Sequence, residues 1–244
     1  MKRKKTLLLL ILLLMISSFK LYAKELKLAV GLALPPYFIQ ENDSGLELDI
    51  IRAALKSKGY TVQPVFLPFA RIIKAMDEGK VDCASPINEN SGVKAHYSDT
   101  HIFYQNFAVS LKSNNLRVNT IDDLMNKKIV SFQNAKKYLG NEFATMASNN
   151  PDYLEKANQE TQNLLLFKNR TQIVVGDINI FKYYTRKVAN RVDTTQEVVY
   201  HSLFPKTYYK VAFRDESVKN DFNEGLKQIR ASDLYQKIIA QYTK

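Results

Sequence analysis

The sequence predicts an α/β fold, and three observations support this. From Lys24 onward, strand-like and helix-like segments alternate along the chain. The first of them form two consecutive strand–helix–strand units, an order that implies a parallel sheet with helical crossovers. A polar break at residues 112–115 then separates these units from a second α/β series. With 244 residues, 45% of them hydrophobic, the chain is long enough to bury a sizeable core.

Residues 1–23 have the pattern of a secretory signal peptide. Five residues with four basic side chains open the chain, an apolar run covers 7–16, Ser17 and Ser18 follow, and a small residue, Ala23, stands at the exit. The apolar run is too short for a stable membrane span, so the alternative of an uncleaved anchor is less favoured. We therefore expect cleavage near Ala23, although Leu21 is large for its place before the cut, and a periplasmic location.

The composition argues against several classes of protein. Removing residues 1–23, which hold five basic residues and no acidic one, lowers the formal net charge from +11 to +6. This mild charge and the absence of a basic–aromatic signature argue against nucleic acid as a partner. The spacing of His96, His101 and His201 does not fit metal ligation, so we expect neither a metal nor a cofactor. Cys83 is the one cysteine, in a strand-like run that predicts a buried thiol and no disulfide.

The elements of the first series follow from periodicity and from turn residues. Asp49 is expected to cap the first helix, which ends near Gly59, and Gly79 to end the second. The expected strands are 26–30, 62–67 and 81–87, and the expected helices are 50–55 and 69–76.

The second series begins after an apolar, β-rich strand. Thr120 and Asp123 have the spacing of a capping box, and Ser232 is placed to cap the last helix. The expected strands are 103–111, 128–132, 173–177 and 208–213, and the expected helical segments are 136–147, 164–167, 178–188, 218–229 and 234–242.

Several landmarks together resemble the periplasmic solute-binding proteins of the polar amino-acid type, which are extracellular solute-binding proteins of family 3 associated with ABC transporters. The resemblance covers nearly all of the chain after residue 23, and it rests on order and spacing because each mark alone is unspecific. The marks are Pro36-Tyr37, Gly45-x-Glu47-x-Asp49, Pro68-Phe69-Ala70-Arg71, Gly79-Lys80-Val81-Asp82, Tyr97-Ser98-Asp99, Val175-Gly176-Asp177 and Val211-Ala212-Phe213.

This resemblance implies the two-lobed periplasmic binding protein fold of type II, with two crossing hinge strands. Lobe 1 would comprise residues 24–111 and 203–244, and lobe 2 residues 112–202. The ligand would bind in the cleft between the lobes, at the carboxyl ends of parallel strands, and the lobes would close on it about the hinge.

Asp177 follows a buried strand and is the foremost candidate for ligand contact. The resemblance places there an acid that binds the ammonium group of the ligand, because a carboxylate accepts charge-assisted hydrogen bonds. The alternative is a cap for the helix that follows.

Four further residues of the first lobe are candidates by the same resemblance. Phe69 would form an aromatic wall against the ligand, or instead belong to the core face of its helix. Tyr37 and Leu34, in the loop after the first strand, could line the cleft or pack at its edge. Arg71 could reach an anion or lie on the surface.

The chain departs from the family pattern at two places. Ser91 stands where amino-acid binders carry an arginine that clamps the α-carboxylate. The anion-binding turn of the family reads here Gln133, Asn134, Ala135, Lys136, Lys137. We hypothesise that Lys136 supplies the cation that Ser91 lacks, while the alternative is that both lysines are solvated.

The expected function is capture of a small polar ligand by a monomer that delivers it to an inner-membrane ABC permease. A membrane receptor is the other possible partner, and a sensing or docking protein of the same fold is the alternative role. A periplasmic dehydratase-like enzyme is less favoured, because no nucleophile elbow or phosphate-binding glycine loop is present, so the prediction is a protein that is not an enzyme.

Overall fold

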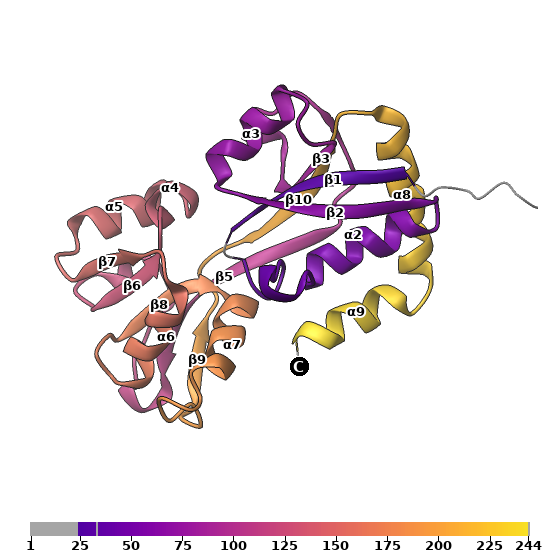
Figure 1. Ribbon diagram of the computed structural model, residues 1–244. Coiled ribbons are helices and arrows are strands. Elements are labelled where there is room, and N and C mark those ends of the chain that lie inside the picture. Colours follow the sequence, from indigo (N-terminus) through magenta and orange to yellow (C-terminus); the bar gives the residue numbers. More distant parts are fainter. Residues whose placement is uncertain (1–23, 33, 244) are drawn as a thin grey trace, which may run out of the picture.

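A computed structural model describes residues 24–32 and 34–243 as two α/β lobes (Figure 1). The predicted signal peptide at residues 1–23 lies outside the described residues. None of the helices in the described part is long and apolar enough to cross a membrane. The predicted α/β fold with two lobes is confirmed.

Lobe 1 is a mixed sheet with helices on both faces. β1 pairs in parallel with β2 and β3, and β10 pairs antiparallel with β3. Leu28 faces the helices α2, α8 and α9, whereas the neighbouring Ala29 faces α3, as the alternation of a strand requires. The elements are β1 (Lys24–Gly31), α2 (Leu46–Lys56), β2 (Tyr60–Leu67), α3 (Phe69–Asp77), β3 (Cys83–Ile87), β4 (His96–Tyr97), β5 (Ile102–Leu111), β10 (Lys206–Phe213), α8 (Glu216–Ala231) and α9 (Leu234–Thr243).

Lobe 2 repeats this plan on a smaller scale. β6 lies between β7 and β8 and pairs in parallel with both, and β9 pairs antiparallel with β5. One buried cluster lies under α5 and a second under α6 and α7. The elements are β6 (Ile129–Phe132), α4 (Ala135–Tyr138), α5 (Asn141–Asn149), β7 (Tyr153–Lys156), α6 (Gln159–Phe167), β8 (Ile173–Asp177), α7 (Ile178–Lys187) and β9 (Val198–His201).

Two long strands join the lobes, and both are visible at the centre of Figure 1. Residues 102–105 of β5 pair with β10, and residues 106–109 of the same strand pair with β8 of lobe 2. β10 continues into the sheet of lobe 1 beside β3. These are the crossing strands that the resemblance implied. The boundaries drawn at 111/112 and 202/203 stay predictions.

The structure corrects two predicted helix boundaries. The first helix begins after Gly45 and not at Asp49, whose carboxylate instead accepts a hydrogen bond from Tyr242 at 2.5 Å. Gly45 has φ +143°, and a Cβ there would lie 2.2 Å from the carbonyl oxygen of Tyr37, so only glycine fits this start. The helix expected over 136–147 is two helices, α4 and α5, separated at Gly140 with φ +92°.

Two smaller predictions are confirmed. Cys83 is fully buried, as its strand-like setting indicated. The predicted capping box is present, since the Asp123 carboxylate accepts the amide of Thr120 at 2.9 Å and the Asp123 amide donates to the Thr120 hydroxyl at 3.3 Å. The helix that it caps is a single 3-10 turn at Asp122–Leu124.

Candidate functional site

Tyr37 joins the two lobes at the crossing strands. Its ring is fully buried and stacks on Tyr104 of β5, with ring centroids 3.7 Å apart and an interplanar angle of 16°. Its hydroxyl donates to Asp177 Oδ1 at 2.9 Å and accepts a hydrogen bond from Asn179 Nδ2 at 3.0 Å. A residue of the loop after β1 therefore bonds to the start of α7 in lobe 2.

Asp177 ends β8 and caps α7. Besides Tyr37, its carboxylate accepts hydrogen bonds from the backbone amides of Asn179 (2.9 Å), Ile180 (3.1 Å) and Gln105 (2.9 Å). Burial raises the pKa of Asp177 above its ordinary value of 3.8, and the four hydrogen bonds oppose that shift. The capping role is thus observed, while the role in ligand binding stays a prediction.

The geometry limits how a ligand could use this acid. Asp177 is 4% exposed, and three of its four donors converge on Oδ1, while Oδ2 accepts only the amide of Gln105. The Tyr37 hydroxyl is the one side-chain donor among the four, so burial and the crowding of Oδ1 limit the approach of a ligand ammonium group.

Glu47 is the centre of a buried polar cluster that the sequence did not assign to the site. Its Oε2 accepts the Tyr104 hydroxyl at 2.6 Å, and its Oε1 lies 2.9 Å from His101 Nε2 and accepts the Ser85 hydroxyl. Burial, reinforced by the charge of Glu47, raises the pKa of Tyr104 well above its ordinary value of 10.0, so the phenol remains a donor. Glu47 thereby fixes the ring on which Tyr37 stacks. The signal for it was the Gly45-x-Glu47-x-Asp49 mark, which places this acid in the first turn of α2.

The start of α3 presents Phe69 and Arg71 to solvent. Phe69 is 45% exposed, whereas Ile72, Ala75 and Met76 form the buried face of the helix. The alternative that Phe69 is a core residue is therefore wrong. Both side chains are free to meet a ligand. Leu34, in the preceding loop, is half-buried and bridges to Phe38.

Ser91 is engaged within lobe 1. Its hydroxyl lies 3.1 Å from the Tyr97 hydroxyl and accepts the amide of Val93 at 3.4 Å. In the same 3-10 turn, Glu89 forms an ion pair with Lys210 of β10 at 2.5 Å. The ammonium group of Lys210 is thus already paired with a carboxylate of the protein.

The turn after β6 is occupied by an acid of the protein itself. The backbone amides of Asn134 and Lys136 donate to the Glu155 carboxylate at 2.7 and 3.1 Å, and the Tyr153 hydroxyl donates to it at 2.9 Å. Partial burial works to raise the pKa of Glu155, but these three hydrogen bonds outweigh it and hold the pKa below the ordinary value of 4.5. Gln133, at the start of the turn, is exposed.

The structure shows where the side chain of Lys136 lies. Its side chain is exposed, and the ammonium group lies 5.9 Å from the centroid of the Tyr153 ring. A role of this ammonium in ligand binding stays a prediction.

The structure brings only some of the candidate residues together. Tyr37 and Asp177 are in direct contact, and the turn at residues 133–136 lies at the same sheet edge as Asp177, because β6 and β8 are neighbouring parallel strands. None of the described hydrogen bonds joins Arg71 or Ser91 to Asp177. Among the described residues, no cluster of three or more histidine, cysteine or acidic side chains is arranged to hold a metal ion.

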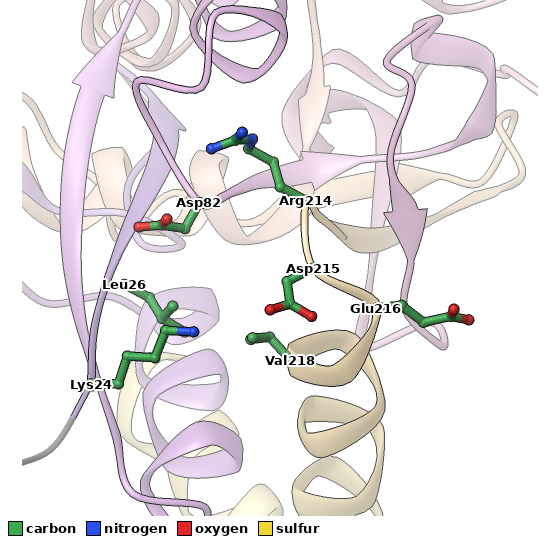
Figure 2. A pocket seen from close by; sticks show the side chains of 7 residues that line it. All are labelled: Lys24, Leu26, Asp82, Arg214, Asp215, Glu216 and Val218. Atoms are coloured by element: carbon green, nitrogen blue, oxygen red, sulfur yellow. The ribbon is translucent and has the colours of Figure 1, made fainter.

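A surface pocket lies at the other end of lobe 1 (Figure 2). It lies at the start of β1, whereas Tyr37 follows the carboxyl end of that strand. Its acids have structural partners: Asp82 accepts the amide of Lys27 at 2.8 Å, and Asp215 caps α8 through the amide of Ser217 at 2.8 Å. The pocket is therefore separate from the candidate site. It is lined by Lys24, Leu26, Asp82, Arg214, Asp215, Glu216 and Val218.

The comparison with protein families agrees with this architecture. The two lobes on crossing strands have the fold of the two-lobed solute-binding proteins. The chain belongs to the bacterial extracellular solute-binding proteins, family 3, whose sequence model matches residues 26–244. A sequence comparison with curated proteins gives no match.

Solved structures share the fold at low sequence identity. An ancestral arginine-binding protein bound to arginine is 21% identical with a TM-score of 0.69, over 91% of this chain and 100% of that one. The GluR0 ligand-binding core in complex with L-glutamate is 17% identical with a TM-score of 0.71, over 91% and 99%. A substrate-binding protein of an ABC uptake transporter from Streptococcus pneumoniae with bound histidine is 15% identical with a TM-score of 0.68, over 89% and 92%. At these identities the likeness shows the fold alone.

Proposed function

We propose that this chain is an exported solute-binding protein that captures a small polar ligand between its two lobes and delivers it to an ABC transporter. The observation that carries the proposal is the pair of crossing strands, β5 and β10, in a chain that belongs to family 3. Two lobes joined by such strands can close about a hinge and enclose a ligand.

The proposed ligand contacts lie on both lobes. On lobe 1 they are the exposed Phe69 and Arg71 and the half-buried Leu34 and Ser91. On lobe 2 the contacts are Asp177 with Tyr37 against it, and the turn of Gln133, Asn134 and Lys136.

Export and the membrane partner belong to the same proposal. The pattern of residues 1–23 supports secretion into the periplasm, which agrees with an extracellular family. An inner-membrane permease is the proposed partner of a monomer. A membrane receptor would take its place if the protein senses its ligand.

An enzymatic role has one finding in its favour. A matched structure, 22% identical with a TM-score of 0.68, is an ancestral amino acid-binding protein described as a precursor of cyclohexadienyl dehydratase. Here, however, the acid–base groups Ser85, His101 and Glu47 are buried in lobe 1, out of reach of a substrate. Binding without catalysis is therefore the role that we propose.

A thermal-shift screen against amino acids, amines, organic acids and small peptides tests the proposal. A ligand at 100 times its Kd stabilises the folded state by about 2.7 kcal/mol, which raises Tm measurably. Since the chain has no tryptophan, the signal must come from an external dye or from tyrosine. A clear rise in Tm with one compound class supports capture of a solute, whereas no rise across the whole panel contradicts it.

A pair of variants locates the site. Phe69→Ala should weaken the response to the ligand because it removes an exposed wall of the site without leaving a cavity in the core. Leu234→Ala removes a similarly exposed apolar side chain, at the start of α9, and should leave the response unchanged. An equal response in both variants would place the ligand elsewhere.

A further inference from the structure

Backbone amides in lobe 2 and an ammonium group in lobe 1 could bind a ligand carboxylate, but they are paired with glutamates of the protein. In lobe 2, Glu155 receives the backbone amides of Asn134 and Lys136. In lobe 1, Lys210 is paired with Glu89 beside Ser91. The two pairs lie on different lobes and form independently of one another.

The backbone of lobe 2 is shaped for this contact. Asn134 has φ +66°, a left-handed conformation that asparagine tolerates, and it aims two nearby amides at one carboxylate. The Tyr153 hydroxyl is the third donor, so three of the roughly four acceptor positions of the Glu155 carboxylate are filled. The ionised carboxylate of Glu155 therefore already occupies the two backbone amides of this turn. If these amides were unpaired, they would attract an anion.

Glu155 lies at the same sheet edge as the proposed ligand-binding site. β6 and β7 are parallel with Phe132 opposite Lys156, and β6 is parallel to β8. The turn after β6, Glu155 near the end of β7 and Asp177 at the end of β8 thus share one sheet edge. In the view of Figure 1, α4 after this turn and α3, which carries Phe69, both lie above the crossing strands.

We infer that Glu155 is a specificity-determining residue that excludes a carboxylate, and that the ligand is a cationic amine or guanidine without an α-carboxylate. The inference rests on the proposed function and names the ligand class for that site. A carboxylate would meet the charge of Glu155 and find its amides taken, whereas an ammonium or guanidinium group is attracted by that charge.

The other groups around this edge are compatible with a cation. The Lys136 ammonium lies over the Tyr153 ring and offsets part of the charge of Glu155, and Asp177 adds a second acid. Tyr138 on α4 is 56% exposed, and with Phe69 it offers aromatic faces that attract cations. Arg71 is the cation that opposes this assignment most directly, because its side chain is exposed at the start of α3.

Matched pairs of compounds test the inference on the purified protein by titration calorimetry. The pairs are L-arginine and agmatine, L-lysine and cadaverine, and L-histidine and histamine, each an amino acid and its decarboxylated amine. We expect at least one amine to bind tenfold or more tightly than its parent amino acid. Glu155→Gln, which keeps the size of the side chain and removes the charge, should reduce that ratio at least tenfold. Glu197→Gln, in a surface ion pair with Lys112, should leave the ratio unchanged.

Tighter binding of the parent amino acids, or a ratio that Glu155→Gln leaves unaltered, would overturn the inference. Amino-acid binding that Lys136→Ala or Arg71→Ala abolishes would do the same and would identify the cation that holds the carboxylate. Silence toward all six compounds, with a hit of another class in the broad thermal-shift panel, overturns the ligand class and leaves the proposed function standing. Silence in both experiments overturns both.

Discussion

Single side chains connect the core of lobe 1 to the start of α7. Glu47 accepts the Tyr104 hydroxyl, Tyr104 stacks on Tyr37, and Tyr37 bonds to Asp177. Each link is buried, so each polar group depends on its partner for satisfaction. This chain of contacts positions the junction between the lobes, and the two acids in it, Glu47 and Asp177, are both buried.

The Tyr37 hydroxyl can be removed without disturbing the stack. Tyr37→Phe deprives the buried Asp177 of one donor and Asn179 of its acceptor, so we expect a loss of about 2 kcal/mol in the free energy of unfolding by urea denaturation. Tyr60→Phe is the control, because the Tyr60 hydroxyl donates at 2.7 Å to Asp221 in a partly exposed setting, and it should cost less than about 1 kcal/mol. Equal losses would contradict the buried link.

At the level of elements, close backbone contact decides how the helices of lobe 1 pack. α8 crosses α2 at Gly225, where a Cβ would lie 1.9 Å from the carbonyl oxygen of Ala54. Glycine inside a helix ordinarily costs about 1 kcal/mol relative to alanine. Here the absence of a side chain is what permits the approach of the two helices.

Gly225→Ala should therefore destabilise the protein despite its better helix propensity. Moving the Ala54 backbone away should cost on the order of 3 kcal/mol, which exceeds the gain in propensity and lowers Tm by several degrees. Lys227→Ala, on the exposed side of α8, should change the stability by less than about 0.5 kcal/mol. A stabilised Gly225→Ala variant would show that the helices do not pack this closely.

The hydrogen bonds between β7 and the turn after β6 predict how the stability of the protein changes at acidic pH. The folded-state pKa of Glu155 lies below 4.5, so its ionised form contributes stability above that pH and loses the contribution as the pH falls through the lower folded pKa. Glu155→Gln should be less stable than the wild type near neutral pH, and the difference should vanish as the solution is acidified. Glu41→Gln, an exposed acid of lobe 1, should show a much smaller difference in the same pH series of urea denaturation.

On the scale of the whole molecule, the lobes are connected by the two crossing strands and by contacts of α7 with lobe 1. β5 and β10 pass between them, and Ile180 and Tyr184 of α7 pack against the large buried cluster of lobe 1. Each lobe also has a buried cluster of its own. Closure about these strands requires rotation of two rigid bodies, a common motion of such folds.

Small-angle X-ray scattering should detect this closure. With a saturating ligand from the thermal-shift screen, the radius of gyration should decrease, because the lobes approach one another. Compounds that leave Tm unchanged should leave the radius of gyration unchanged as well. A tight ligand that produces no decrease would indicate a protein already closed before binding.

The sequence predicted the larger strands and helices because their hydrophobic periodicity is strong. β7 and β9 were not predicted, since each has four residues and a mixed pattern that takes its strand form from its neighbours. The sequence singled out Asp177, Tyr37 and Phe69 as ligand contacts, and this stays a prediction; the structure places the first two at the junction and Phe69 exposed at a helix start. Glu155 was missed because its local sequence does not show which distant amides it meets, and Glu47 stood in a recognised mark that does not show which hydroxyls it accepts.

The sequence by itself determined the α/β class, the family resemblance and the replacement of the clamping arginine by Ser91, because these follow from local pattern and spacing. Only the tertiary structure decided that Asp177 is satisfied by Tyr37 and that Glu155 fills the turn at Asn134. These contacts join residues 140 and 21 positions apart along the chain. Their geometry depends on the packing of strands, which periodicity does not encode.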